Sequence, residues 1–249
     1  AFERGALESE MANVSKLKER DRLRAVLLSS VSHDLRTPLT TILGLLGEIR
    51  AADAEQGRQL AETQAEAERL NRFVANLLDM VRIESGSLEQ SIEPVDLTDA
   101  AATAVHDMRR ALHGRQVDLQ IPPDLPFVLV DPQLFHHCLI NLIENAVKYG
   151  ASTAPITIRA RRNPGNLVLS VLDEGPGLPE GEEKRIFETF ARIEGSDRKG
   201  GSGLGLAIVK GFSDAMGITI EASNRTDRPG ACFSLVFPEA KLVIGERDE

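Results

Sequence analysis

The sequence predicts two regions of different fold, a helical hairpin that forms a dimeric four-helix bundle and, after it, an α+β domain. Apolar residues recur every seven positions in the first region, at Leu28, Leu35, Ile42 and Ile49. This spacing is typical of helices that pack along a bundle seam. Beyond Glu93-Pro94 the pattern changes, and short alternating strand patterns mix with helical ones. The 42% of residues that are hydrophobic suffice to bury a core.

The first region is expected to contain two long helices, from about residue 8 to 50 and from about 54 to 84, joined by a turn near 51–56. The second helix repeats the spacing, at Leu60, Ala67, Val74 and Val81. Two helices joined by a short turn form a hairpin, and a lone hairpin leaves part of each apolar seam in water. We therefore expect two copies of the chain to pair.

The second region is expected to be a mainly antiparallel sheet with helices on one face. Its best-marked element is a helix that stops at Gly150, because Asp131-Pro132 supplies an N-cap and a proline at the first helical position. The other expected helices span 97–112 and 204–216, with a short amphipathic piece at 186–190. The expected strands span 117–121, 127–130, 155–162, 167–173, 218–222 and 231–237.

Composition argues against several classes of function. Aromatic residues make up 4% of the chain, Trp is absent and the net charge is −9, so neither base stacking nor a general attraction to nucleic acid is expected. No apolar run approaches the roughly 18 residues of a membrane span, and no secretory signal is visible. The two cysteines, Cys138 and Cys232, suit a reducing cytoplasm. We expect a cytoplasmic fragment without direct membrane contact.

The first predicted helix carries a reactive segment around His33. With Leu28 and Leu35 on the seam, His33 falls at the most exposed heptad position, which argues against a core histidine. An exposed imidazole is a competent nucleophile when a carboxylate takes its proton, and Asp34 is adjacent. Thr37 lies one turn further on the same face, where its hydroxyl could position a water. The alternative is an ordinary solvated helix face.

The helix after Pro132 carries a polar stripe, with Asn141, Asn145 and Lys148 at positions i, i+4 and i+7. An amide oxygen is a hard ligand suited to Mg²⁺, and a lysine can reach phosphate oxygens. The alternative is a solvent-exposed face in which Glu144 pairs with Lys148.

Two glycine-rich turns follow in the second region. Asp173 ends a strand and enters Glu174-Gly175-Pro176-Gly177, where its carboxylate could accept from an amino group, although an ordinary turn is the alternative. Residues 200–206, Gly-Gly-Ser-Gly-Leu-Gly-Leu, then lead into a helix. Closely spaced glycines before a helix expose amides to an anion, or else form a tight capping turn.

In this order the motifs resemble the histidine-kinase core of two-component systems, over roughly residues 20–238. Residues 32–39, Ser-His-Asp-Leu-Arg-Thr-Pro-Leu, resemble the H box. The other four motifs resemble the N box (141–149), the G1 box (173–177), the F box (187–190) and the G2 box (201–206). Residues 77–83, 139–149 and 230–233 resemble more narrowly the potassium-responsive subfamily of these kinases.

The resemblance implies a dimeric helical bundle followed by a Bergerat-type (GHKL) α/β sandwich that binds ATP and Mg²⁺. It also implies autophosphorylation on His33 and transfer to an aspartate of a response regulator, with phosphatase activity on that regulator. The domains implied are an N-terminal signalling helix (1–22), a phosphotransfer domain (23–86), a linker (87–95), the ATP-binding domain (96–240) and a tail (241–249). The full-length protein is expected to be anchored in the bacterial inner membrane.

The resemblance also assigns roles to individual residues. His33 would accept the phosphoryl group, Asp34 would be its acid/base partner, Thr37 would position water and Arg192 would reach the γ-phosphate. Asn145 would hold Mg²⁺ beside Asn141. Nucleotide contacts would come from Lys148, Tyr149, Asp173, Gly175, Gly177, Gly201, Gly203, Leu204 and Gly205. Two positions depart from the family pattern, with Asp34 where Glu is common and Glu174 where Asn is frequent.

Two other functions fit parts of this pattern. One is an ATPase without phosphotransfer, as in GHKL chaperones and DNA-repair ATPases, against which the H box argues. The other is a pseudokinase scaffold that only dimerises and docks partners, against which Asn145, Asp173 and the G2 glycines argue.

Overall fold

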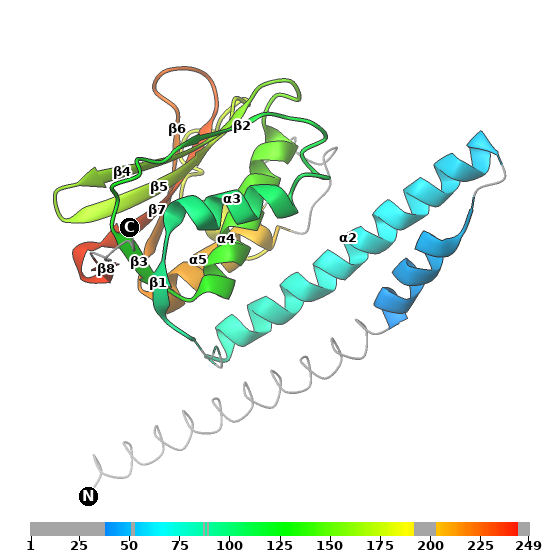
Figure 1. The fold of residues 1–249 in the computed structure, drawn as a ribbon, viewed down its shortest axis with the longest axis horizontal. Coiled ribbons are helices and arrows are strands. Elements are labelled where there is room, and N and C mark those ends of the chain that lie inside the picture. Colours follow the sequence, from blue (N-terminus) through cyan, green and yellow to red (C-terminus); the bar gives the residue numbers. More distant parts are fainter. Residues whose placement is uncertain (1–37, 51–52, 87, 89, 192–202, 244–249) are drawn as a thin grey trace, which may run out of the picture. The chain divides into compact units, whose positions relative to one another are not determined.

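The structure, a computed structural model, describes residues 38–50, 53–86, 88, 90–191 and 203–243 (Figure 1). The chain divides into two compact units, Ala1–Leu88 and Glu89–Glu249, and each is described by itself. Within the described residues, no helix is both long and apolar enough to cross a bilayer.

The described part of the first unit is a helical hairpin, as the sequence predicts. Residues 38–48 are helical, and α2 (Ala54–Glu84) follows the turn. Asp53 caps α2 by accepting from the Gln56 amide at 2.8 Å, and the Gln64 side chain donates to the Leu46 carbonyl at 2.9 Å. Several large apolar side chains remain exposed on this hairpin, namely Ile42, Leu45, Ile49, Leu70 and Phe73.

The second unit is built on a five-stranded sheet of order β2-β4-β5-β7-β6. Its strands are β2 (Val117–Gln120), β4 (Ile156–Asn163), β5 (Asn166–Leu172), β6 (Thr219–Asn224) and β7 (Ala231–Pro238). The pair β2–β4 is parallel and the other three pairs are antiparallel. The prediction of a mainly antiparallel sheet is therefore confirmed, with one parallel edge.

A second, three-stranded sheet has the order β1-β3-β8 and was not predicted as a sheet. Its strands are β1 (Glu93–Val95), β3 (Phe127–Val130) and β8 (Leu242–Val243). Two of these strands are only two or three residues long, which is too short for a hydrophobic alternation to be seen in the sequence. Short 3-10 turns occur at Arg185–Phe187 and Glu239–Lys241.

Three helices, α3 (Leu97–Asp107), α4 (Pro132–Tyr149) and α5 (Gly205–Met216), lie over one face of the five-stranded sheet (Figure 1). Strand residues alternate between faces, and the face toward the helices is apolar, with Ile158 and Leu235 fully buried. On α4, Phe135, Leu139 and Leu142 are fully buried as well. Each such side chain contributes about 1.5–3 kcal/mol relative to exposure, so this layer holds α4 firmly.

The helix predicted over residues 97–112 is shorter than expected. It ends at Asp107, and residues 108–114 form successive turns that leave Met108 and Leu112 buried. His113 has a φ of 49°, which a right-handed helix cannot accommodate. The chain reverses there before it enters β2.

Candidate active site

The C-terminal half of α4 provides one wall of the candidate site. The stripe predicted there lies on a single helix face, since residues at i, i+4 and i+7 are neighbours. Asn141 donates from Nδ2 to the His137 carbonyl at 2.9 Å. The Nδ2 of Asn145 is buried and has no hydrogen-bond partner within the described residues. Buried polar atoms are normally paired, so the unpaired Asn145 nitrogen is a donor that an acceptor on a bound ligand could satisfy.

The start of α5 packs directly against this face of α4. A Cβ added to Gly205 would lie 2.8 Å from the Oδ1 of Asn141, so any other residue here would displace the Asn141 side chain. The preceding Leu204 is fully buried at the N-terminal end of α5. The structure therefore brings the second glycine turn to the polar stripe, although more than fifty residues separate them in the sequence.

Asp173, directly after β5, provides the second wall. Its side chain is 3% exposed. One carboxylate oxygen, Oδ1, accepts from the Gly175 amide at 2.8 Å and from the Ala231 amide at 3.2 Å. Within the described residues the other oxygen, Oδ2, has no hydrogen bond, so it remains available to an external donor.

The ionisation of Asp173 reflects a balance between burial and its neighbours. Burial raises the pKa of the carboxyl group, whereas the two backbone hydrogen bonds and the charges of Arg115 and Arg225 lower it. The net direction is upward. The carboxylate form of Asp173 is therefore favoured first by the two backbone hydrogen bonds and then by the two nearby guanidinium groups.

The turn after Asp173 is held by an unpredicted side chain. Asn224, at the end of β6, accepts from the Leu178 amide at 2.6 Å and donates to the Leu178 carbonyl at 2.8 Å. Gly177 has a φ of 80°, and a Cβ there would lie 2.4 Å from the Oδ1 of Asn224. The turn therefore needs glycine for both its conformation and its close approach to Asn224.

A hollow of about 510 Å³ lies between the end of α4 and this turn. It is lined by residues 147–152 and 174–176, which include the predicted Lys148, Tyr149 and Gly175. The Lys148 ammonium lies 4.7 Å from the centroid of the Tyr149 ring, a cation–π distance. One side of the candidate site is thus a concave surface with a positive charge and an aromatic face.

The F box and the G2 box meet at the other end of the site. The Phe190 amide donates to the Gly203 carbonyl at 3.1 Å, and Phe190 has a φ of 63° with its side chain 61% exposed. A left-handed conformation is uncommon for a non-glycine residue. This contact brings Phe190 of the F box and Gly203 of the G2 box together.

Five predicted site residues lie outside the described residues. They are His33, Asp34, Thr37, Arg192 and Gly201. The structure brings the others together around α4, the Asp173 turn and the start of α5, namely Asn141, Asn145, Lys148, Tyr149, Asp173, Gly175, Gly177, Gly203, Leu204 and Gly205.

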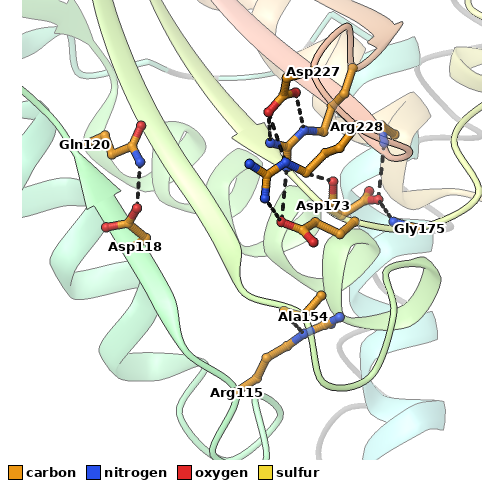
Figure 2. A network of polar contacts seen from close by, with 11 residues as sticks. Arg115, Asp118, Gln120, Ala154, Asp173, Gly175, Asp227 and Arg228 are labelled. Carbon is orange, nitrogen blue, oxygen red and sulfur yellow. Dashed lines mark hydrogen bonds and ion pairs between the residues drawn. The ribbon is translucent and has the colours of Figure 1, made fainter.

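Two arginines near Asp173 were missed by the sequence analysis (Figure 2). Arg115, just before β2, donates to the carbonyls of Ala146, Val147 and Ala154 at 2.6–3.2 Å, and so caps the end of α4. Arg225 donates to the Asp173 carbonyl at 3.2 Å. Neither lies in a recognisable motif.

The arrangement offers complementary groups for a nucleotide. The carboxylate of Asp173 is suited to accept from an amino donor, the amide of Asn145 and the ammonium of Lys148 are suited to donate to phosphate, and the glycine turns permit close approach. Within the described residues no group of three or more His, Cys, Asp or Glu side chains could hold a metal ion. A cation at Asn145 would therefore need further ligands from the nucleotide phosphates.

Comparison with known proteins identifies both units. Residues 23–86 match the His Kinase A (phospho-acceptor) domain, and residues 130–241 match the family of histidine kinase-, DNA gyrase B-, and HSP90-like ATPases. The sensor protein KdpD of Escherichia coli K12 is 39% identical over 243 residues, covering 96% of this chain and 27% of the relative. KdpD of Mycobacterium tuberculosis is 33% identical over 240 residues, covering 93% and 27%. The chain thus spans about a quarter of these relatives.

Solved structures agree on the fold. Full-length ShkA in complex with AMPPNP matches with a TM-score of 0.70 and 29% identity, covering 88% of this chain and 46% of that chain. The kinase ThkA in complex with the response regulator protein TrrA matches with a TM-score of 0.61 over 88% of this chain and 64% of that chain, at 20% identity. At that identity, the second likeness concerns the fold alone.

Proposed function

This chain belongs to the sensor histidine kinases and is similar to KdpD. We propose that it transfers the γ-phosphoryl group of ATP to its own His33 and then to an aspartate of a response regulator. The observation that carries this proposal is the convergence of Asp173, the polar face of α4 and the glycine start of α5. These three features come from distant parts of the sequence. Asp173 suits the adenine end of a nucleotide, and the other two suit its phosphate end.

Asp173 would recognise the adenine end. Its Oδ2 would accept from the exocyclic amino group, while Gly175 and Gly177 keep the turn close enough for the ring to enter. Tyr149 would offer a ring face beside the base, and the Lys148 ammonium would reach phosphate oxygens.

Asn145 would hold Mg²⁺ through its side-chain oxygen, beside Asn141. The fit rests on the amide oxygen, a hard ligand of the kind Mg²⁺ takes, while the buried Nδ2 of the same side chain, unpaired in the described part of the protein, would donate to a phosphate oxygen. A bound Mg²⁺ would neutralise phosphate charge. The glycine turn that includes Gly201, Gly203, Leu204 and Gly205 would offer backbone amides to the phosphates, and Arg192 would reach the γ-phosphate.

The phosphotransfer step would use the residues of the H box. A His33 ring nitrogen would attack the γ-phosphorus, so that a nitrogen–phosphorus bond forms as the bond to ADP breaks, and Asp34 would take the ring proton. In the phosphatase activity on the regulator, the Thr37 hydroxyl would position a water for hydrolysis of the aspartyl phosphate.

The partners proposed are a second copy of the chain and a response regulator similar to KdpE, in a potassium or osmotic response of a full-length protein anchored in the inner membrane. The exposed apolar side chains of the hairpin, including Ile42 and Leu45, support pairing, since burial of such a surface drives association. Light scattering at tens of micromolar, a rough range for such interfaces, should give a dimer. A monomer would contradict this part.

The test of the function is the chemical stability of the phosphoprotein formed with ATP and Mg²⁺. A phosphohistidine is labile to acid and stable to base. The His33→Gln variant should form no phosphoprotein. ATP hydrolysis without a phosphoprotein would favour a chaperone-like ATPase instead. Calorimetry showing no nucleotide binding would favour a pseudokinase scaffold.

A further inference from the structure

A buried arginine lies directly behind the residue proposed to recognise adenine. Arg225 follows β6 in the turn that leads to β7, and its side chain is only 6% exposed. Its Nη1 donates to the main-chain carbonyl of Asp173 at 3.2 Å. The Asp173 backbone is also paired with Ala231, whose carbonyl accepts from the Asp173 amide at 3.0 Å. The end of β5 is therefore held by the strand β7 and by this turn.

The orientation of Arg225 is in turn imposed by an acidic residue in the same turn. Asp227 accepts from Nε at 3.0 Å and from Nη2 at 2.7 Å, a two-point contact that fixes the plane of the guanidinium group. These hydrogen bonds from Arg225 hold the pKa of Asp227 well below its usual range. Asp227 therefore remains charged wherever a nucleotide site would operate.

A second arginine ties the same turn to the residue that follows Asp173 (Figure 2). Arg228 donates to Glu174 at 2.8 Å and to Asp227 at 3.0 Å. Glu174 is one of the two residues that depart from the family pattern, and the structure shows Arg228 as its partner. Arg228 is 52% exposed, so its ion pairs contribute little to stability.

We propose that Arg225 is a positioning residue of the nucleotide site, which acts by hydrogen bonding to the Asp173 carbonyl and by placing a fixed positive charge behind the Asp173 carboxylate. Arg225 acts on adenine indirectly, through Asp173. This inference therefore rests on the proposed function, in which Asp173 recognises adenine. Arg228 is assigned no such action, because its contacts are with Glu174 and Asp227 rather than with Asp173.

The charges around Asp173 come from several elements. Arg115 approaches from the segment before β2, and Arg225 approaches from the β6–β7 turn; both lower the pKa of Asp173 against the effect of burial. Glu174, Asp227 and Arg228 complete the cluster on the turn side, while Lys148 and Tyr149 line the hollow at the end of α4. Removing the charge of Arg225 should raise the pKa of Asp173. As the pH is lowered, Asp173 in the variant should take up its proton at a higher pH than in the wild type. ADP binding that requires the carboxylate should therefore be lost at a higher pH than in the wild type.

The experiment is calorimetric titration of the whole chain with ADP as a function of pH. The variants are Arg225→Met, Arg225→Lys and, as the matched control, Arg228→Met, which removes a charge from the same turn. The phosphates of ADP titrate identically in every sample, so differences between variants report on the protein. Fluorescence of Tyr149, the only Tyr in a chain without Trp, checks that each variant is folded.

Arg225→Met should weaken ADP binding about tenfold or more at pH 7.5, a loss typical of one charge-assisted hydrogen bond, and should move the acidic midpoint of binding upward. Arg228→Met should keep the wild-type midpoint. Arg225→Lys should keep the midpoint, because its charge remains, but bind less tightly. If the Met variant does not fold, the Lys variant decides, and wild-type affinity in it overturns the proposal.

An unchanged midpoint in a folded Arg225→Met variant, or an equal shift in Arg228→Met, would also overturn the proposal. Either result would leave the proposed function intact as long as the wild type binds ADP. Absence of ADP binding in the wild type would instead contradict the proposed function itself.

Discussion

Replacing Gly177 by alanine separates two costs that the structure assigns to this position. Gly177 has a φ of 80°, and the left-handed conformation costs an alanine about 1–2 kcal/mol. The added Cβ would also lie 2.4 Å from the Asn224 side-chain oxygen. Asn224 would have to move and lose its two hydrogen bonds to Leu178, worth up to about 1 kcal/mol each. We expect a total loss of about 3 kcal/mol in the free energy of unfolding.

Gly165→Ala is the matched control. Gly165 lies in the β4–β5 turn with a φ of 83°, and a Cβ there would meet nothing within 4 Å. It should therefore lose only the conformational part, about 1–2 kcal/mol. Urea unfolding followed by Tyr149 fluorescence reports on the second unit alone, since the chain has no other Tyr and no Trp.

A double variant isolates the contact with Asn224. In an Asn224→Ala background the Cβ at position 177 no longer meets the Asn224 side chain, and its distance of 3.4 Å from the Gly230 carbonyl oxygen is an ordinary van der Waals contact. Gly177→Ala should then cost no more than Gly165→Ala does in the wild type. Equal losses for Gly177→Ala and Gly165→Ala in the wild-type chain would refute the reasoning, as would a full loss for Gly177→Ala in the Asn224→Ala background.

Three further substitutions test individual roles. Gly205→Ala should weaken ADP binding in calorimetry because its Cβ displaces Asn141, 2.8 Å away, while the fold persists since alanine favours the helix by about 1 kcal/mol; unchanged affinity would remove this contact from the site. Asn145→Asp should abolish autophosphorylation in a labelling assay and leave the dimer intact, and wild-type turnover would mean that the metal site is misassigned. Thr37→Ala should keep near-normal autophosphorylation but slow regulator dephosphorylation markedly, because positioning a water contributes large rate factors; a loss of labelling as severe as in His33→Ala would contradict this division.

The elements with strong local signals were predictable from the sequence. Asp131-Pro132 and Gly150 bound α4 as expected, since caps act through a few neighbouring residues. The strands predicted at 155–162 and 167–173 were also found, as β4 and β5, which pair in an antiparallel hairpin. The strands β1 and β8 were not predicted, because their pairing with β3 depends on residues far away in the chain.

The contrast between local signals and contacts with distant residues applies to the site as well. Asn145 and Asp173 lie in motifs, so their chemistry was visible in the sequence. Arg225 and Asn224 act through single contacts with a turn about fifty residues earlier, and nothing around them in the sequence indicates this. Glu174 was noticed as a departure, but only the structure identifies Arg228 as its partner.

The central claim is that His33 carries a phosphoryl group from ATP to a regulator, and following the label tests it most directly. The chain is labelled with γ-³²P-ATP and Mg²⁺, freed of nucleotide, and mixed with a panel of purified response regulators. The account predicts that label leaves the wild-type chain and appears as an aspartyl phosphate on one regulator, while His33→Gln is never labelled. Label that stays on the chain with every regulator, or equal labelling of His33→Gln, would contradict it.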